Sequence, residues 1–487
     1  MLSPRKDLLR VVRHELRVLA ADRSLWVVSA LLVLLCAYAL ANGLDHSRAR
    51  DRARADALLE QAAASDALRA SWRRVMTRQE PPDPWANPTD PSLVGSGLAT
   101  RYATLPTAPL APLALGQSDM LPDSYAVTTA SRVEFMYDSE IENPWNLLTG
   151  RFDLAFVITY LLPLFVLGWS YNLLASEREQ GTLRLLLSQP VRLGAVVAAK
   201  VAVRAAVLGV GCAALPLAAL LALGAPLRGP AGLGLLAGAG ALIAAYALFW
   251  FALAVLVDAL ARSSALGALV LVSSWVLLVL VVPVALSLGA ALASPAPSRA
   301  ELATETRTIT AQSLARFADE FGSDYRHVHD PELLLPKNGR FEVPARLRAF
   351  FRASHELDSR LELALAAFDT QLAGQQAIVD RLGVLSPAIV VHEALAALAG
   401  NGTSRYQQFQ FQVAAFHAEW RRFFQPRISE GLAITEADLD VLPRFVWVEQ
   451  APASLAKETL SSLLALLAAA ALVAFAARRA LARYPVA

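Results

Sequence analysis

The stretch "SEREQGTLRLLLSQPVR" occupies residues 176–192 and separates two long apolar segments. It holds two acids, three arginines and a glycine, so it does not belong in hydrocarbon. A membrane-spanning helix needs roughly 20 mainly apolar residues. Segments of this kind occur on both sides of the stretch and elsewhere in the chain, at 25–42, 152–171, 195–223, 233–257, 265–288 and 460–476. The predicted fold is therefore an all-α membrane protein with six transmembrane helices.

The composition agrees with a membrane protein. Of the 487 residues, 55% are hydrophobic, and the formal net charge is only +2. So small a charge gives no global basic field to attract a nucleic acid. The two cysteines, Cys36 and Cys212, both lie in apolar runs. We expect them to be buried thiols and not a disulfide framework.

Lysine and arginine residues near the span ends predict the orientation, because cytoplasmic loops carry an excess of them. The quoted stretch has Arg178, Arg184 and Arg192, and Arg262 lies between the fourth and fifth spans. With six spans these residues fall on the same side as the basic ends of the chain, and Arg228 is the exception. Both termini are therefore expected in the cytoplasm. The basic residues before the first span and in the cytoplasmic tail, 477–487, are Arg5, Lys6, Arg10, Arg13, Arg17, Arg23, Arg478, Arg479 and Arg483.

Residues 1–24 are predicted to form a cytoplasmic helix in the membrane interface. On a 3.6-residue period Leu8, Val12, Leu16 and Leu19 share one face, and basic residues cluster opposite. Such a helix lies in the interface with its arginines toward anionic headgroups. A solvated charge run is the alternative interpretation. The residues expected to face headgroups are Arg10, Arg13 and Arg17.

Two large, mainly helical extracytoplasmic insertions are predicted, at 43–151 and 289–457. In the first, "SYAVTTASRVEFMY" allows a short strand. In the second, Ser386-Pro387 suits a helix start, Ser404 is a candidate cap, and the "NGT" sequon at Asn401 is interpreted as a turn. The helices expected in the second insertion are 299–321, 344–382, 387–399 and 404–424.

Residues 172–194 form the cytoplasmic connection between the second and third spans. Ser176 is a candidate cap for a helix whose first turn holds Glu177 and Glu179. Gly181 allows a bend, and the leucines that follow give one apolar face at helical spacing. An apolar face on a cytoplasmic helix predicts a partner, either the membrane surface or a docked protein. A tight turn packed only on headgroups is the alternative.

The segment "EREQGTLRLLLSQPVRLGAVVAAK" resembles the stretch after the second span in permeases of type-2 ABC exporters, the ABC-2 family. In that family the stretch forms a coupling helix that fits a groove on the ATP-hydrolysing subunit. The basic first helix and the six-span layout with both termini inside are similar too. By this resemblance, the residues that couple to the ATPase are Glu177, Glu179, Gly181, Thr182, Leu183, Leu186 and Leu187.

The outer insertions resemble a branch of these permeases with large extracytoplasmic domains, related to those of gliding motility and nitrous oxide reductase maturation. The segments that carry this resemblance are "LAPLALGQSDMLP", "ENPWNLLTGRFDLAFVI" and "LSPAIVVHEALAALAGNGTSRYQQFQFQVAAFHAEWRRFF". The resemblance covers most of the chain. It implies a multi-pass protein of the bacterial cytoplasmic (inner) membrane.

No G-x-x-x-x-G-K-[ST] phosphate loop occurs in the sequence, so no cofactor is expected in this chain, and ATP and Mg²⁺ are expected in a partner ATPase. The chain is then a non-catalytic permease subunit that drives export of a substrate or movement of its outer domains. The resemblance implies two ABC ATPase subunits per complex and a second permease, identical or a paralogous sister. Membrane lipids and a periplasmic protein are further candidate partners, and no nucleic acid is expected.

A membrane-anchored sensor or assembly scaffold without transport is the alternative function, and it needs no ATPase. No metal site is expected, because the two histidines of "YRHVHDPE" have no convincing third ligand nearby, and a polar surface turn is favoured. Charges within the spans are few. Lys200 and Arg204 can snorkel toward the cytoplasmic interface, and Asp258 lies at the inner end of the fourth span.

Overall fold

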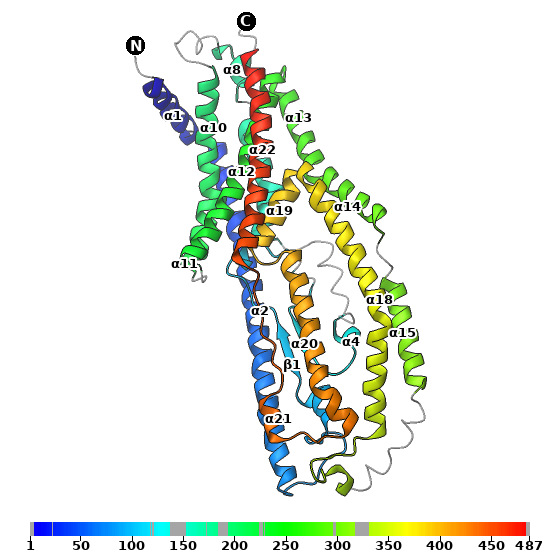
Figure 1. Cartoon of the computed structure of the whole chain (residues 1–487). Coiled ribbons are helices and arrows are strands. Elements are labelled where there is room, and N and C mark those ends of the chain that lie inside the picture. The colour runs from blue at the N-terminus through cyan, green and yellow to red at the C-terminus, as the bar shows by residue number, and fades with distance from the viewer. Residues whose placement is uncertain are drawn as a thin grey trace.

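The computed structural model describes residues 4–21, 23–116, 118, 121–136, 152–171, 173–183, 193–223, 227, 229–295, 299–316 and 331–483. Figure 1 shows an elongated, mainly helical molecule with a helical bundle at one end and a second helical body, here called the outer body, at the other. Helix α1 (Pro4–Ala21) and the C-terminal end of α22 (Pro452–Ala482) lie at the end of the bundle farthest from the outer body.

Among the described residues, five helices are long and apolar enough to cross a membrane. The segment predicted as the second span contains a shorter apolar helix, Leu154–Ser170, which is below the length of roughly 20 residues that a span needs. The all-α membrane class is confirmed, whereas six spans and their orientation stay predictions. The five helices are α2 (Arg23–Met76), the continuous α10–η4–α11 (Leu193–Ala222), α12 (Pro230–Leu260), the continuous α13–η5–α14 (Ser264–Ala293) and α22.

Three of the apolar helices contain a π-helical turn just before a proline. Pro163, Pro216 and Pro283 are each the second residue of the α-segment that follows such a turn. Proline lacks an N–H and its ring crowds the preceding turn, so a wider turn accommodates it. The segments are α6 (Leu154–Phe156), η3 (Val157–Leu161) and α7 (Leu162–Ser170); α10 (Leu193–Gly209), η4 (Val210–Ala214) and α11 (Leu215–Ala222); α13 (Ser264–Trp275), η5 (Val276–Val281) and α14 (Val282–Ala293).

Helix α12 forms the centre of the bundle and packs along α22. Its Tyr246 and Trp250 are fully buried, and the Tyr246 hydroxyl donates to the carbonyl of Thr159 at 2.8 Å. The short apolar helix α19 (Pro387–Leu398) packs on α12 and α22. Its N-cap Ser386 accepts from the Ile389 amide, which confirms the predicted start.

Helix α2 runs without a break from the bundle into the outer body (Figure 1). Its 54 residues make it about 80 Å long at 1.5 Å per residue. The predicted first span and the beginning of the first predicted insertion therefore form one continuous helix.

The two predicted insertions share one hydrophobic core. Val94 and Tyr125 of the first pack in the same cluster as Phe409, Trp420 and Phe424 of the second. Strands β1 and β2 pair antiparallel and confirm the predicted short strand. The elements of the two insertions besides α2 and α19 are α3 (Pro91–Leu93), η1 (Val94–Leu98), β1 (Arg101–Thr104), η2 (Ala111–Leu113), β2 (Ser124–Val127), α4 (Arg132–Met136), α15 (Arg299–Arg316), η6 (Pro331–Leu334), α18 (Ala345–Leu382), η7 (Gly383–Leu385), α20 (Thr403–Glu430) and α21 (Glu436–Asp440).

The helices expected in the second insertion are present, with shifted ends. Helix α15 is described to Arg316, and residues 317–321 lie outside the described part of the chain. Helix α20 extends six residues beyond the predicted end at Phe424. The predicted cap Ser404 is wrong, because Gly402 is the N-cap of α20 and Ser404 instead accepts from Gln450 at 3.0 Å.

At Gly43, helix α2 packs directly against the backbone of η2. A Cβ at this position would lie 2.1 Å from the Pro112 carbonyl oxygen. We expect Gly43→Ala to lower the Tm of the detergent-solubilised chain, since forcing extra volume into a packed site costs about 1–3 kcal/mol. Thermal unfolding followed by tryptophan fluorescence measures the change. Gly289→Ala in α14 meets no atom within 4 Å and should leave the Tm unchanged or higher; equal losses in both variants would contradict this account.

Asp90 makes the stability of the outer body depend on pH. It is the buried N-cap of α3, and its carboxylate accepts from the Ser92 amide at 2.8 Å. Burial raises the pKa of Asp90 from 3.8 to about 7, although hydrogen bonds from the α3 backbone oppose the rise. Because the folded pKa is the higher one, the contribution of Asp90 to stability is fully present below its unfolded pKa and is lost as the pH rises through 7.

Asp90→Asn keeps the oxygen acceptor but cannot ionise. We therefore expect wild type to lose stability relative to Asp90→Asn between pH 5 and pH 7, by at most about 1.4 kcal/mol per pH unit. Thermal unfolding of both proteins at a series of pH values gives the difference. Two parallel stability curves would rule out Asp90 as the titrating group.

Candidate functional site

The connection that follows α7 lies at the end of the bundle that carries α1 and the end of α22 (Figure 1). Its described part contains the short helix α8 (Ala175–Glu179) and continues to Leu183. Charged side chains from α10 and α12 contact it directly. The described part of the connection is therefore fixed to the neighbouring helices by polar contacts.

The N-terminus of α8 is held by Asp258, a buried acid near the end of α12. Its Oδ2 accepts from the Leu174 amide at 2.5 Å and its Oδ1 accepts from the Ala175 amide at 3.3 Å. A carboxylate at this position accepts hydrogen bonds from amides that have no partner within the helix, and its negative charge interacts favourably with the positive end of the helix dipole. The predicted cap Ser176 is wrong, because α8 begins one residue earlier and another helix supplies the cap.

Lys200 on α10 ties the same connection to a second helix. Its Nζ donates to Glu177 Oε1 at 2.6 Å and to the Leu173 carbonyl at 3.0 Å. Lys200 is only 8% exposed, and a buried cation needs such partners. Lys200 is thus bound inside the chain and does not snorkel, and Glu177 is turned toward the bundle.

Glu179 binds a third helix. It is exposed, and its Oε1 accepts from the backbone amide of Ser264, the first residue of α13, at 2.8 Å. This hydrogen bond favours the charged carboxylate and lowers the pKa of Glu179. Both acids of the connection therefore have a role within the chain, since each fixes the connection to a different helix.

The residues after α8 divide into exposed and buried parts. Gly181 has φ +73°, a left-handed conformation, with open space around it. Thr182 is exposed and donates to the Glu177 carbonyl at 3.2 Å. Leu183 is buried and packs in one cluster with Ala259. Of the predicted coupling residues, Leu186 and Leu187 lie outside the described part of the chain, and within the described part residues 179–182 are exposed.

Helix α1 packs against α10 through a buried ion pair. Glu15 is 4% exposed and accepts from Nη2 of Arg204 at 2.9 Å. Arg204 therefore pairs within the chain, as Lys200 does. Of the residues predicted to face headgroups, Arg13 and Arg17 are exposed, and the side chain of Arg10 lies outside the described set.

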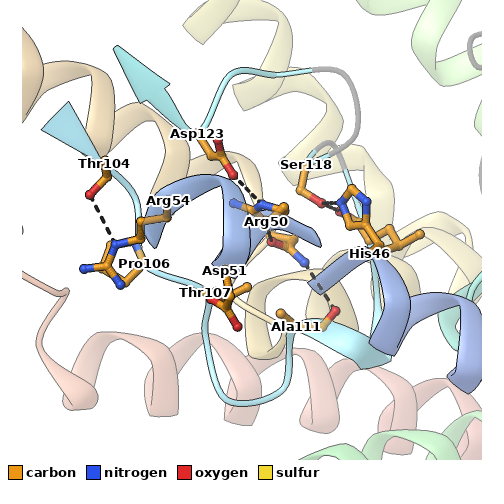
Figure 2. A network of polar contacts seen from close by, with 12 residues as sticks. His46, Arg50, Asp51, Arg54, Thr104, Pro106, Thr107, Ala111, Ser118 and Asp123 are labelled. Carbon is orange, nitrogen blue, oxygen red and sulfur yellow. Dashed lines mark hydrogen bonds and ion pairs between the residues drawn. The ribbon is translucent and has the colours of Figure 1, made fainter. Parts of the chain in front are cut away.

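A second polar cluster joins α2 to the outer body. Arg50 donates from Nε to Asp123 at 2.9 Å (Figure 2) and from Nη1 to the Asn401 side chain at 3.0 Å. Asn401 donates in turn to the carbonyls of Ala111 and Ala114, at 3.4 and 2.7 Å. Asn401 thus occupies the predicted turn and connects the start of α20 to the η2 loop.

Neighbouring turns of α2 extend this cluster. Arg54 donates to the Thr104 hydroxyl at 3.2 Å, and the Thr107 hydroxyl bonds Asp51 (Figure 2). Thr104 is the last residue of β1, and Thr107 lies in the segment that follows it. The outer part of α2 is therefore bound by its polar side chains to the segment between the two strands.

A family model described as ABC-2 family transporter protein matches residues 9–480. The chain belongs to this family. The match covers every apolar helix and the outer body. A search of curated proteins finds no match to the chain.

As a member of the ABC-2 family, the chain is a membrane permease of an ABC transporter, and its apolar helices make it a multi-pass membrane protein. Permeases of this family are generally non-catalytic membrane components that partner with ABC ATPase subunits. The resemblance drawn from the sequence is confirmed for the family. The branch related to gliding motility and nitrous oxide reductase maturation stays a prediction.

Sequence reasoning selected Glu177 and Glu179 in this ABC-2 permease but missed the side chains from other helices that hold their connection. Asp258 and Lys200 stood out only as isolated charges near span ends. The signal that could have revealed these contacts was the position of Asp258 and Lys200 near the same ends of their spans as Glu177. Charged side chains at such positions in a membrane protein pair with one another or with backbone groups.

Removal of Lys200 should expose how the connection is held. Lys200→Met leaves Glu177 partly buried without its cation, and we expect a loss of about 3 kcal/mol in stability and a lower Tm in detergent. Adding Glu177→Gln should recover much of this loss, because the uncompensated charge is gone. Thermal unfolding of the three proteins is the measurement, and a double variant as unstable as Lys200→Met would refute the ion pair.

Proposed function

We propose that this ABC-2 permease couples ATP hydrolysis by separate ATPase subunits to movement of its extracytoplasmic body, or to export of a substrate. ATP and Mg²⁺ bind the ATPases and not this chain. The working complex contains two ATPases and a second permease, identical or a paralogous sister. It lies in a bacterial cytoplasmic membrane, with 172–194 facing the ATPase.

The observation that supports this proposal is the set of contacts that fix the exposed turn 179–182 to neighbouring helices. Asp258, Lys200 and Glu179 bind the connection to three different helices at distances between 2.5 and 3.3 Å. A push on a loose loop would be lost in bending the loop. A push on this turn is transmitted to α10, α12 and α13, as a mechanical coupling requires.

The course of α2 favours movement of the outer body over export alone. One helix joins the bundle to the far end of the outer body, and Asp123 and Asn401 bind its Arg50 near the point where it leaves the bundle. A change in the angle of α2 therefore displaces the outer body directly. A periplasmic protein that binds the outer body is the partner on which such movement would act.

A sensor or scaffold without transport remains the competing function, and ATPase coupling separates the two. Glu179→Lys loses the hydrogen bond to Ser264 and places a cation at the positive N-terminus of α13. We expect about a five- to tenfold loss of permease-stimulated ATP hydrolysis in reconstituted membranes. Glu179→Gln keeps the acceptor and should lose much less.

Glu436→Lys is the matched control, since Glu436 is also a carboxylate held by a hydrogen bond, from Arg73, but lies in the outer body. It should leave stimulated hydrolysis unchanged. Full ATPase association and turnover in Glu179→Lys would overturn the coupling assignment. Wild-type chain that co-purifies with no ATPase would favour the scaffold.

A further inference from the structure

Arg101, at the start of β1, is a buried cation without an acidic partner. It is 6% exposed, and its guanidinium makes one hydrogen bond, from Nη1 to the Ser65 hydroxyl at 2.7 Å. Its Nε is buried with no hydrogen-bond partner. Within the described residues no carboxylate forms an ion pair with Arg101.

Two further arginines surround it. Arg69 on α2 and Arg444 on the segment after α21 lie close enough that their charges, together with burial as the main cause, lower the pKa of Arg101. Arg69 pairs with Asp440 at 2.9 Å. Arg444 is exposed and forms no ion pair with a described residue. Three guanidinium groups and one carboxylate leave two positive charges without compensation.

Other buried arginines of the outer body are paired. Arg405 donates from Nε and Nη2 to the two oxygens of Glu449, both at 2.8 Å, and Arg421 donates to Asp358 at 2.8 Å. Burying a charge is unfavourable unless it is paired and hydrogen-bonded. Arg101 therefore lacks the anion that the same domain supplies to comparable residues.

We propose that Arg101, Arg69 and Arg444 form an oxyanion-binding site of the outer body, and that its ligand is a phosphate group on a soluble molecule. Guanidinium groups bind phosphate through paired hydrogen bonds, and two uncompensated positive charges match a dianion. Of the three arginines, Arg444 alone lines an open groove of about 590 Å³, whose lining also includes Phe411, Phe445 and the acid Glu419. The groove gives room for the rest of the ligand.

The position of the site argues against a lipid headgroup. Arg101 bonds Ser65, which lies 23 residues along α2 from the predicted end of the first span at Asn42. At 1.5 Å per residue this places the site about 35 Å along the helix from the bundle. A phosphate of the same bilayer does not reach that far, so the ligand is expected to come from the extracytoplasmic solution.

Titration of the full chain in detergent with inorganic phosphate tests the site, with chloride at equal ionic strength as the salt control. Isothermal titration calorimetry should give saturable binding. Arg444→Met, an exposed substitution that leaves the fold intact, and Arg101→Met should each weaken phosphate binding at least about tenfold, a loss in the range of charge-assisted hydrogen bonds. Without phosphate, Arg101→Met should be as stable as wild type or more stable, because it removes an unpaired buried charge.

Arg405→Met is the matched control, because it removes a buried arginine that has its carboxylate. It should lower the Tm with and without phosphate and leave the phosphate affinity unchanged. Absence of saturable binding to wild type, or full binding by Arg444→Met, overturns the proposal. Loss of phosphate binding in nanodiscs of anionic phospholipid, compared with neutral ones, would identify a lipid as the occupant and also contradict it. None of these outcomes depends on ATPase coupling.

Discussion

One buried carboxylate fixes the connection between α7 and α10 in this permease. Asp258 accepts the amides that open α8. Once α8 is held there, Glu177 lies within reach of Lys200 and Glu179 within reach of the α13 N-terminus. Each contact satisfies a polar group that apolar surroundings would otherwise leave unpaired. The connection is therefore part of the bundle, and its exposed turn, 179–182, follows residues that are hydrogen-bonded to three other helices.

The same requirement governs the other end of the bundle. Arg50 is held by Asp123 and Asn401, and Asn401 satisfies two carbonyls of the η2 loop. These bonds connect α2, the segment between the strands and the start of α20. Partnered charges thus hold both the connection after α7 and the contact of α2 with the segment between the strands. Arg101 differs, because it is buried in the outer body without an ion pair to a described residue.

Local patterns predicted much of this structure. The apolar helices follow from runs of hydrophobic residues, and α18 and α19 from helical spacing and the Ser386-Pro387 start. The pairing of Asp258 with amides more than 80 positions earlier could not be predicted, because periodicity carries no information about distant partners. For the same reason the two insertions were expected to be separate, whereas Tyr125 of the first and Phe409 of the second belong to one hydrophobic core. The resemblance to a family indicated the permease role. The contacts of Asp258, Lys200 and Glu179 that hold the connection are visible only in the structure.

The uninterrupted course of α2 amplifies small rotations. Between Gly43 and Met76 the helix is about 50 Å long. A tilt of about 5° at its base sweeps the tip sideways by about 4 Å, by the geometry of a rigid rod of that length. A rearrangement too slight to open a path through tightly packed helices therefore becomes, at the tip, a displacement of side-chain size.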